Sequence, residues 1–331
     1  MRVSVLILVA LVALGGAGIA QAGGVIDRVK KEGVVHCGGM EQPGLAMTGD
    51  AGKVTGLNVD LCRAIAVAVL GPDGRADFHT YGFVSDETSM FNHDLVRDGT
   101  DEVAFLTGSQ VFDAKLAGKL VPGPTVFYDS TNVIVPANFP GDRFKDLAGA
   151  KVCFVIGSSA HRAMEAQLDA QKIDFQRFKF SEYGEMEDAY NVQHCQAMVD
   201  EVTALAQLRL EPGINHLVSK ILPEPLSVFP IMAFTGTEDG QWAALVAWTL
   251  HSVIRSEIPE TPWLAGGVAA IPVVAPELGL EAGWQQRVIA AVGTYGDIFR
   301  RNLGTDSPFK LDRGVNAQAA DGGLFLAPYS E

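Results

Sequence analysis

The sequence predicts an α/β protein built from two lobes that a hinge connects. Short apolar segments alternate with helical periods along the chain, a pattern typical of parallel strands covered by helices. The length of 331 residues exceeds the usual size of one domain. Two proline-bounded strand segments, one ending at Pro136 and one around Phe229, would carry the chain into an inserted lobe and back. We therefore expect a first lobe formed by residues 23–136 and 232–331 and a second lobe formed by 137–231.

The first 22 residues have the composition of a secretory signal peptide. Arg2 is their only charge, residues 3–20 are largely apolar, and Ala20-Gln21-Ala22 forms an A-x-A cleavage site. An uncleaved membrane anchor is the alternative, but the small residues at the end of the segment favour cleavage. Cleavage would leave 309 residues (331 − 22) that begin at Gly23. We expect an exported chain without a membrane span, because no later stretch reaches about 20 apolar residues.

The net charge of −14 limits the kinds of partner that the surface can meet. A strongly acidic surface repels nucleic acid and anionic membranes, so neither is an expected partner. Hydrophobic residues make up 48% of the chain, which is enough for a sizeable core in each of two lobes. A local field inside a cleft can still oppose the net charge, so composition does not fix the charge of a ligand.

The first lobe is expected to begin with a strand at Val34–Cys37 and a helix at Asp60–Val69. The helix follows a glycine turn, and Asp60 lies near the positive end of its dipole, where a carboxylate is favoured. Apolar residues then recur at helical spacing. Short apolar or β-branched runs predict further strands at 77–81, 102–106 and 133–135.

The second lobe is expected to contain two strands, at 152–156 and 175–180, and two helices, at 159–170 and 186–195. In the return to the first lobe, periodicity predicts a helix at 241–255 and one long helix at 281–301. The acidic run at 182, 185, 187 and 188 is interpreted as a solvated helix face.

The chain has four cysteines, Cys37, Cys62, Cys153 and Cys195. Export would place them in an oxidising compartment, and four cysteines allow three connectivities. None lies in a C-x-x-C pair, which argues against a zinc site. Disulfides Cys37–Cys62 and Cys153–Cys195 would each stay within one lobe and leave the hinge free, so we expect these two.

Two regions of the chain carry a resemblance to a known family. The helix opening GLNVDLCRAIA within Thr55–Gly71, and the C-terminal stretches Val292–Phe299 and Arg301–Gly304, resemble periplasmic solute-binding proteins for polar amino acids, of the general L-amino-acid type. The resemblance covers nearly the whole mature chain. It implies a type II periplasmic-binding-protein fold that traps a small polar solute and delivers it to an inner-membrane ABC permease. It implies no cofactor, and we expect a periplasmic monomer.

The family resemblance also implies where the solute would bind. Family members hold an α-carboxylate with a first-lobe arginine and with hydroxyls at a second-lobe helix start, and an α-ammonium with a second-lobe aspartate. The hydroxyls match Ser158 and Ser159, for which plain helix capping is the alternative. The aspartate position falls on Glu201, six residues after Cys195, for which a solvated acid at a helix start is the alternative.

The family arginine has no counterpart at the matching position. The family stretch aligns with 109–114, so Ser109 is a candidate contact and Ala114 stands where the arginine is expected. The neighbouring Lys115 cannot make the planar two-pronged grip of a guanidinium. Arg162 or His161 would be a replacement cation, although both also fit the solvent face of their helix. The retained acid at Glu201 then favours an amine-bearing or cationic solute.

Two other functions stay open at this stage. One is a dehydratase-like enzyme on the same scaffold, and the other is an accessory or sensory periplasmic protein with a degenerate ligand site. The sequence contains no P-loop, no H-E-x-x-H and no G-x-S-x-G motif, and its seven histidines are scattered. We therefore predict no catalytic residue and no metal ligand.

Overall fold

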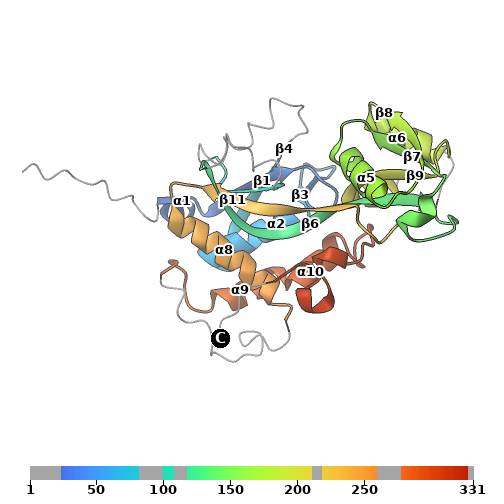
Figure 1. Ribbon diagram of the computed structural model, residues 1–331. Coiled ribbons are helices and arrows are strands. Elements are labelled where there is room, and N and C mark those ends of the chain that lie inside the picture. Colours follow the sequence, from blue (N-terminus) through green and yellow to red (C-terminus); the bar gives the residue numbers. More distant parts are fainter. Residues whose placement is uncertain (1–23, 82–99, 108–117, 211–217, 259–276, 327–331) are drawn as a thin grey trace, which may run out of the picture.

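The computed structural model of the chain describes residues 24–81, 100–107, 118–210, 218–258 and 277–326 (Figure 1). Two bodies are visible, and two long strands run from one to the other. We call the part from residue 144 to residue 221 the smaller lobe and the remaining described residues the larger lobe. Among the described residues, no helix combines the length and apolarity needed to cross a membrane.

The larger lobe contains most of the helices. Its elements up to the first crossover are α1 (Gly24–Glu32), β1 (Val34–Met40), β2 (Met47–Thr48), β3 (Val54–Thr55), α2 (Leu57–Leu70), β4 (Arg75–Tyr81) and β5 (Val103–Thr107). The crossover strands are β6 (Leu120–Pro136) and β11 (Ser227–Gly236). After the return come α8 (Gly240–Arg255), α9 (Trp284–Val292), α10 (Tyr295–Asn302) and the 3-10 turns η2 (Gly314–Asn316) and η3 (Ala319–Asp321).

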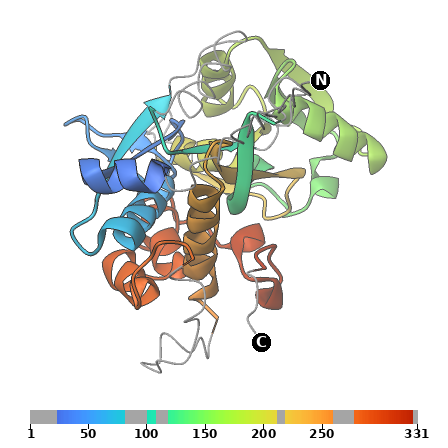
Figure 2. The same ribbon diagram turned by 90° about the vertical axis from the view of Figure 1, so that its left-hand side faces the viewer.

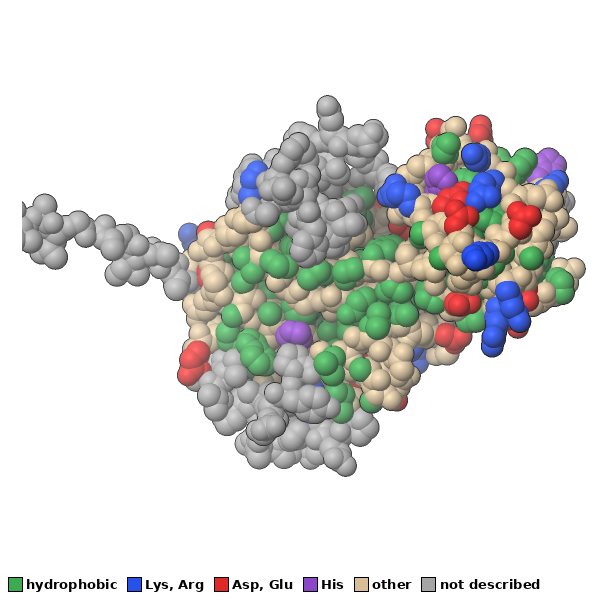
Figure 3. Space-filling model, in the orientation of Figure 1, with side chains coloured by type: hydrophobic (Ala, Val, Ile, Leu, Met, Phe, Trp, Pro, Cys, Tyr) green, Lys and Arg blue, Asp and Glu red, His purple; other side chains and the backbone are tan. Residues whose placement is uncertain are grey.

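The smaller lobe is a compact α/β unit that follows the first crossover. Its elements are η1 (Phe144–Leu147), β7 (Lys151–Val155), α5 (Ser159–Ala170), β8 (Gln176–Phe180), α6 (Tyr183–Asn191), β9 (Ala197–Glu201), α7 (Val202–Leu208) and β10 (Ser219–Ile221). In the space-filling view of Figure 3, charged side chains gather over this lobe, while the larger lobe shows mostly hydrophobic and uncharged groups.

Within the described residues, one mixed sheet of nine strands runs through both lobes in the order β4-β1-β5-β11-β6-β9-β7-β8, and β10 pairs with β6. β1 is parallel to β4 and β5, and β7 is parallel to β8 and β9. The crossover strands pair antiparallel with each other and with their neighbours in both lobes. The expected parallel strands are therefore present in each lobe, but antiparallel pairs join the two lobes.

The cores explain why the elements pack in this way. In the larger lobe α1, α2, α8, α9 and α10 enclose one cluster around Trp242 and Trp284, and Figure 2 shows these helices gathered along one side of the sheet. In the smaller lobe alternate residues of β7 serve two clusters. Phe154 packs with α5, and Cys153 packs with α6 and α7. This alternation follows from the period of two in a strand, so both faces of β7 are buried.

Both expected disulfides are present. Cys37 of β1 joins Cys62 of α2, with Cα atoms 6.2 Å apart. Cys153 of β7 joins Cys195, with Cα atoms 5.9 Å apart. Each bridge closes within one lobe, and neither spans the crossover strands.

Two expected elements differ from the structure, and some short elements were not predicted. α6 ends at Asn191, because Gln193 takes a positive φ of 60° and turns the chain, so Cys195 lies beyond the helix. The expected helix 281–301 is two helices, since Gly293 has φ 80° and Thr294 caps α10. The short elements α1, β9 and α7 were not predicted. The expected signal peptide, residues 1–22, lies outside the described residues.

Candidate functional site

A cavity of about 600 Å³ opens between the two lobes. This volume is in the usual range for sites that bind small molecules. The larger lobe contributes Met40 at the end of β1, the residues 41–43 that follow it, and Thr107 at the end of β5. The smaller lobe contributes residues at the start of α5, on α6 and at the β9–α7 connection. A solute in this cavity would therefore touch both lobes.

Carboxylates dominate the charged groups in the cavity wall. Glu41, Glu187, Asp200 and Glu201 line it, and Arg162 is the one lysine or arginine among its described lining residues. Four negative groups against one positive group give the cavity a negative potential when they are ionised. A cationic solute group is the expected complement.

The two acids at the β9–α7 connection are held by the local backbone. Asp200 is buried at the end of β9, and its Oδ1 accepts a 2.8 Å hydrogen bond from the Glu201 backbone N–H. Glu201 is the N-cap residue of α7, but its side chain does not cap the helix. Glu201 stands at a helix start, as its alternative interpretation has it, but it is half-buried and lines the cavity.

Burial makes both acids hard to ionise. It raises the pKa of Asp200 to about 7, and the charges of Glu201 and Glu187 add to the rise. Burial also raises the pKa of Glu201 to about 7, helped by the charge of Asp129. Burial raises the pKa of Tyr183 to about 12, with further contributions from Asp200 and Glu201. These carboxylates therefore favour a nearby positive charge.

The two serines at the start of α5, Ser158 and Ser159, differ in what they contact. Ser158 is the N-cap residue, because its Oγ accepts a 3.0 Å hydrogen bond from the His161 backbone N–H. Its hydroxyl also donates to the Val155 carbonyl oxygen at 2.9 Å. Ser158 is absent from the cavity wall, whereas the exposed Ser159 lines it. Helix capping therefore accounts for Ser158.

Arg162 and His161, the two candidate replacement cations, lie in different surroundings. Arg162 lies three residues after Ser159, hence on the same helix face, and lines the cavity. Its Nη1 donates a 2.6 Å hydrogen bond to the Gly157 carbonyl oxygen. The His161 ring stacks on Phe154 at 4.6 Å and its Nδ1 accepts from the Gly157 N–H. Arg162 is exposed, in agreement with the solvent-facing interpretation, and it also lines the cavity.

The cavity brings together three of the sequence-predicted binding residues, Ser159, Arg162 and Glu201. Whether they bind solute stays a prediction. Ser109 and the position of the missing arginine, Ala114, lie outside the described residues. The described residues contain no group of three His, Cys, Asp or Glu side chains arranged to hold a metal ion.

Sequence reasoning missed several lining residues. Glu187 was placed on a solvated helix face but lines the cavity, as do Gln42 and Tyr183. Asp129, which raises the pKa of Glu201, was also missed. A signal for it existed: the residues 129–132 form a polar run inside a strand that is otherwise apolar.

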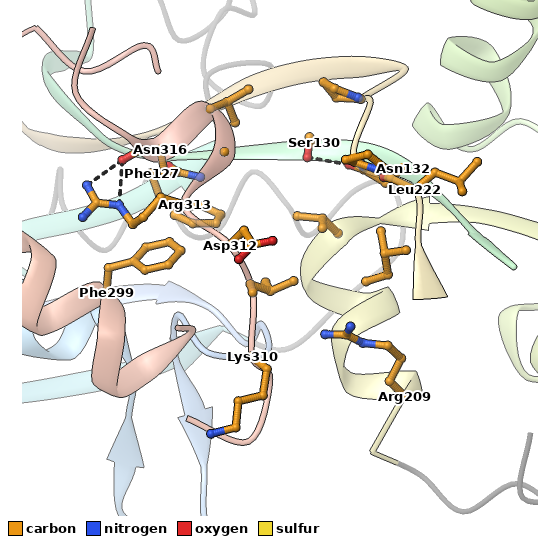
Figure 4. A pocket seen from close by; sticks show the side chains of 17 residues that line it. Phe127, Ser130, Asn132, Arg209, Leu222, Phe299, Lys310, Asp312, Arg313 and Asn316 are labelled. Atoms are coloured by element: carbon orange, nitrogen blue, oxygen red, sulfur yellow. Dashed lines mark hydrogen bonds between the residues drawn. The ribbon is translucent and has the colours of Figure 1, made fainter. Parts of the chain in front are cut away.

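A second cavity of about 190 Å³ lies on the other side of α7 (Figure 4). The crossover strand β6, the loop after β10 and the C-terminal segment 310–316 enclose it. Arg209, Lys310 and Arg313 line it together with Asp312. Arg313 is engaged by the fold, since its guanidinium makes a two-pronged pair with Glu257 at 2.6 and 2.9 Å.

Comparison with known proteins shows what this chain is similar to. No family model matches the chain. The chain is 28% identical to YhdW of Escherichia coli K12, provisionally named an amino-acid ABC transporter-binding protein, over 96% of both chains. It is 26% identical to the general L-amino acid-binding periplasmic protein AapJ of Rhizobium johnstonii, over 95% of this chain and 94% of AapJ.

A solved structure agrees with these relatives. A periplasmic binding protein of an ABC transporter from Brucella ovis, with glutathione bound, is 26% identical and superposes with a TM-score of 0.70. The superposition covers 92% of this chain and 98% of that one. Over nearly its full length this chain is similar to the periplasmic binding proteins of amino-acid ABC transporters. The fold and the cavity between the lobes fit that family, whose members are binding proteins and not enzymes.

Proposed function

We propose that this binding protein captures a small amino-acid-like solute that carries a cationic group and presents it to an ABC permease. The division of charge in the cavity supports the proposal. Asp200 and Glu201 would receive the cationic group, while Ser159 and Arg162 at the start of α5 would receive a carboxylate. Such a solute carries both charges on one molecule.

The cationic preference rests on the state of Glu201. Burial and the charge of Asp129 both raise its pKa, and no other cause shifts it. The ionised form is therefore costly in the ligand-free protein. An ammonium or guanidinium beside Glu201 would offset this cost, whereas a second carboxylate would increase it. Arg162 would take over the carboxylate contact that the sequence comparison left without an arginine at position 114.

Capture would follow from the arrangement of the two lobes. The cavity wall comes from both lobes, and the strands β6 and β11 carry the chain between them. A solute that contacts both walls would favour the closed arrangement. Lobe limits near 137 and 231, export to the periplasm by residues 1–22 and a monomeric state complete the proposal. The permease is the partner that the similarity to this family supports.

A binding screen tests the proposed function. Calorimetry at pH 7.5 would compare L-arginine, L-lysine, L-glutamine, L-glutamate, agmatine and glutathione. We expect L-arginine or L-lysine to bind at least about tenfold more tightly than L-glutamate, because hydrogen bonds to charged groups contribute about 1.5–3 kcal/mol. Tighter binding of L-glutamate would contradict the cationic preference. Absence of binding across the screen would favour the accessory or sensory role.

A variant tests, in the same screen, whether Arg162 contacts the solute carboxylate. Arg162→Gln should weaken L-arginine by about tenfold, since it removes a charge-assisted pair. It should leave agmatine unchanged, because agmatine has the guanidinium and lacks the carboxylate. Lys179→Gln is the matched control, since this exposed cation belongs to the same lobe and does not line the cavity. Equal weakening of both ligands by Arg162→Gln would contradict the assignment.

A further inference from the structure

Asp129 is a fully buried carboxylate beneath the cavity between the lobes. It lies on the crossover strand β6, opposite Phe229 of β11, and its exposed fraction is 0%. Phe229 lines the cavity. Asp129 is therefore at the junction of the two lobes and directly under the site.

The hydrogen bonds of Asp129 join three parts of the molecule. Its Oδ1 accepts from the Ser130 backbone N–H at 2.8 Å. Its Oδ2 accepts from the Thr203 hydroxyl of α7 at 2.9 Å and from the Gln42 amide nitrogen of the larger lobe. Gln42 Nε2 also donates to Thr203 Oγ1 at 3.1 Å. Gln42 and Thr203 both line the cavity.

This network fixes the orientation of the Gln42 amide. An ionised carboxylate can only accept hydrogen bonds. The Thr203 hydroxyl has one proton, and it donates that proton to Asp129. Gln42 must therefore direct its NH₂ group to both partners. The carbonyl oxygen of the same amide then points the other way. Gln42 itself lines the cavity.

The charge of Asp129 has no cationic partner among these contacts. A backbone N–H, a hydroxyl and a neutral amide donate to it. Burial raises the pKa of Asp129 to about 7, and the nearby charge of Asp200 adds to the rise. In turn the charge of Asp129 raises the pKa of Glu201. The three carboxylates thus share one field at the floor of the site.

We propose that Asp129 is a positioning and specificity-determining residue for solute capture. From beneath the floor it supplies negative charge and holds the Gln42 amide so that the carbonyl oxygen faces the solute. The floor then accepts a solute group that is both cationic and rich in N–H donors, a guanidinium or an ammonium. This inference rests on the proposed function and adds the residue that sets the charge preference.

The decisive variant is Asp129→Asn, which keeps the shape and an acceptor oxygen and removes the charge. Calorimetry would compare L-arginine with L-citrulline, its neutral isostere, and L-lysine with Nε-acetyl-lysine. We expect the wild-type preference for the charged member of each pair to fall by about tenfold in Asp129→Asn. The control Asp142→Asn makes the same change in net charge at a side chain that is 72% exposed, and it should keep the preference.

Two outcomes would overturn the inference. One is an Asp129→Asn protein with wild-type discrimination, and the other is equal weakening of the charged and neutral ligands, which marks a merely structural role. Should Asp129→Asn fail to fold, Gln42→Met replaces it. That variant removes the carbonyl acceptor from the floor, and about fivefold weaker binding of L-arginine is expected. Unchanged binding by Gln42→Met would then overturn the inference.

A ligand-free measurement separates this inference from the proposed function. Carboxyl NMR titration should show that Glu201 ionises at a lower pH in Asp129→Asn than in the wild-type protein, because the raising charge is gone. An unchanged titration overturns the role of Asp129 even if amines bind. If the wild-type protein binds no amine, the proposed function fails, and the titration still decides whether Asp129 acts on Glu201.

Discussion

The two cavities on either side of α7 differ in how the fold uses their charges. We call the smaller cavity, lined by Arg209, Lys310 and Arg313, the rear cavity. There Arg313 pairs with Glu257, Arg209 donates to the Phe309 carbonyl oxygen and Lys310 donates to the Thr305 carbonyl oxygen. In the cavity between the lobes, the front cavity, burial and the charge of Asp129 both raise the pKa of Glu201. The three cations of the rear cavity bond to groups of the fold, whereas the raised pKa values of Asp200 and Glu201 favour a solute cation in the cavity between the lobes. The comparison predicts that front variants lose affinity and rear variants lose stability.

Glu201→Gln should show the largest effect on the front side. It removes the half-buried carboxylate proposed to receive the solute cation, so affinity for the charged amino acid found in the screen should fall by about a hundredfold. Stability of the ligand-free protein should hold or rise, because a costly buried acid is removed. Calorimetry and urea unfolding check the two parts. Glu224→Gln, at an exposed side chain, is the control that should change neither.

Arg313→Ala should show the opposite behaviour at the rear. The variant leaves Glu257 without its two-pronged partner and the Asn316 carbonyl oxygen without a donor. It also removes a guanidinium that packs on Tyr295 and Phe299. Unfolding in urea should give a loss of about 2 kcal/mol, below that of a fully buried pair. Solute affinity should stay within about twofold; a large loss of affinity with intact stability would break the comparison.

Solute affinity should rise with pH on the front side. Asp200 and Glu201 have pKa values of about 7, above their ordinary values, so protons occupy them at pH 6 and leave by pH 8. A solute cation binds the deprotonated form, so affinity should increase by up to about tenfold over that interval. Ligand-free stability should change in the opposite direction. The raised pKa values favour the folded state at low pH, and that contribution is lost as pH rises through about 7. Calorimetry and unfolding at each pH check both signs.

Variants of the two serines at the start of α5 should show the smallest effects, one on stability and the other on affinity. Ser158→Ala removes the cap and should lower stability by about 1 kcal/mol without changing affinity. Ser159→Ala removes a hydroxyl from the cavity wall and should weaken an amino acid about threefold with little loss of stability. Thermal unfolding and calorimetry on both variants test this. An affinity loss in Ser158→Ala would show that the cap and the solute share one hydroxyl.

Much of the fold was predictable because local signals specify it. The helix at Ser159–Ala170 was predicted with its observed bounds, since a glycine turn and a capping serine mark its start. The break between α9 and α10 was missed, because the apolar period continues across Gly293 and hides the turn. The antiparallel joining of the lobes was also missed, since strand direction across a crossover depends on contacts distant in sequence.

The site was predictable in part, where a local sequence pattern marks the functional residues. Ser159 and Arg162 were found because a glycine turn marks a helix start, whereas Glu201 was found from its spacing of six residues after Cys195 in the family pattern. Gln42 and Tyr183 carry no such mark, and only the meeting of two lobes brings them together. Asp129 was missed because the strand prediction rested on the apolar residues 133–135 and did not include the polar run before them.

The order of the disulfides has a consequence for how such a chain would mature. The first cysteine pairs with the second, 25 residues on, and the third pairs with the fourth, 42 residues on. For a chain threaded N-terminus first into an oxidising compartment, each thiol therefore meets its correct mate before the next pair emerges. Oxidation in order of arrival gives the native connectivity, so maturation should require an oxidase and little help from a disulfide isomerase.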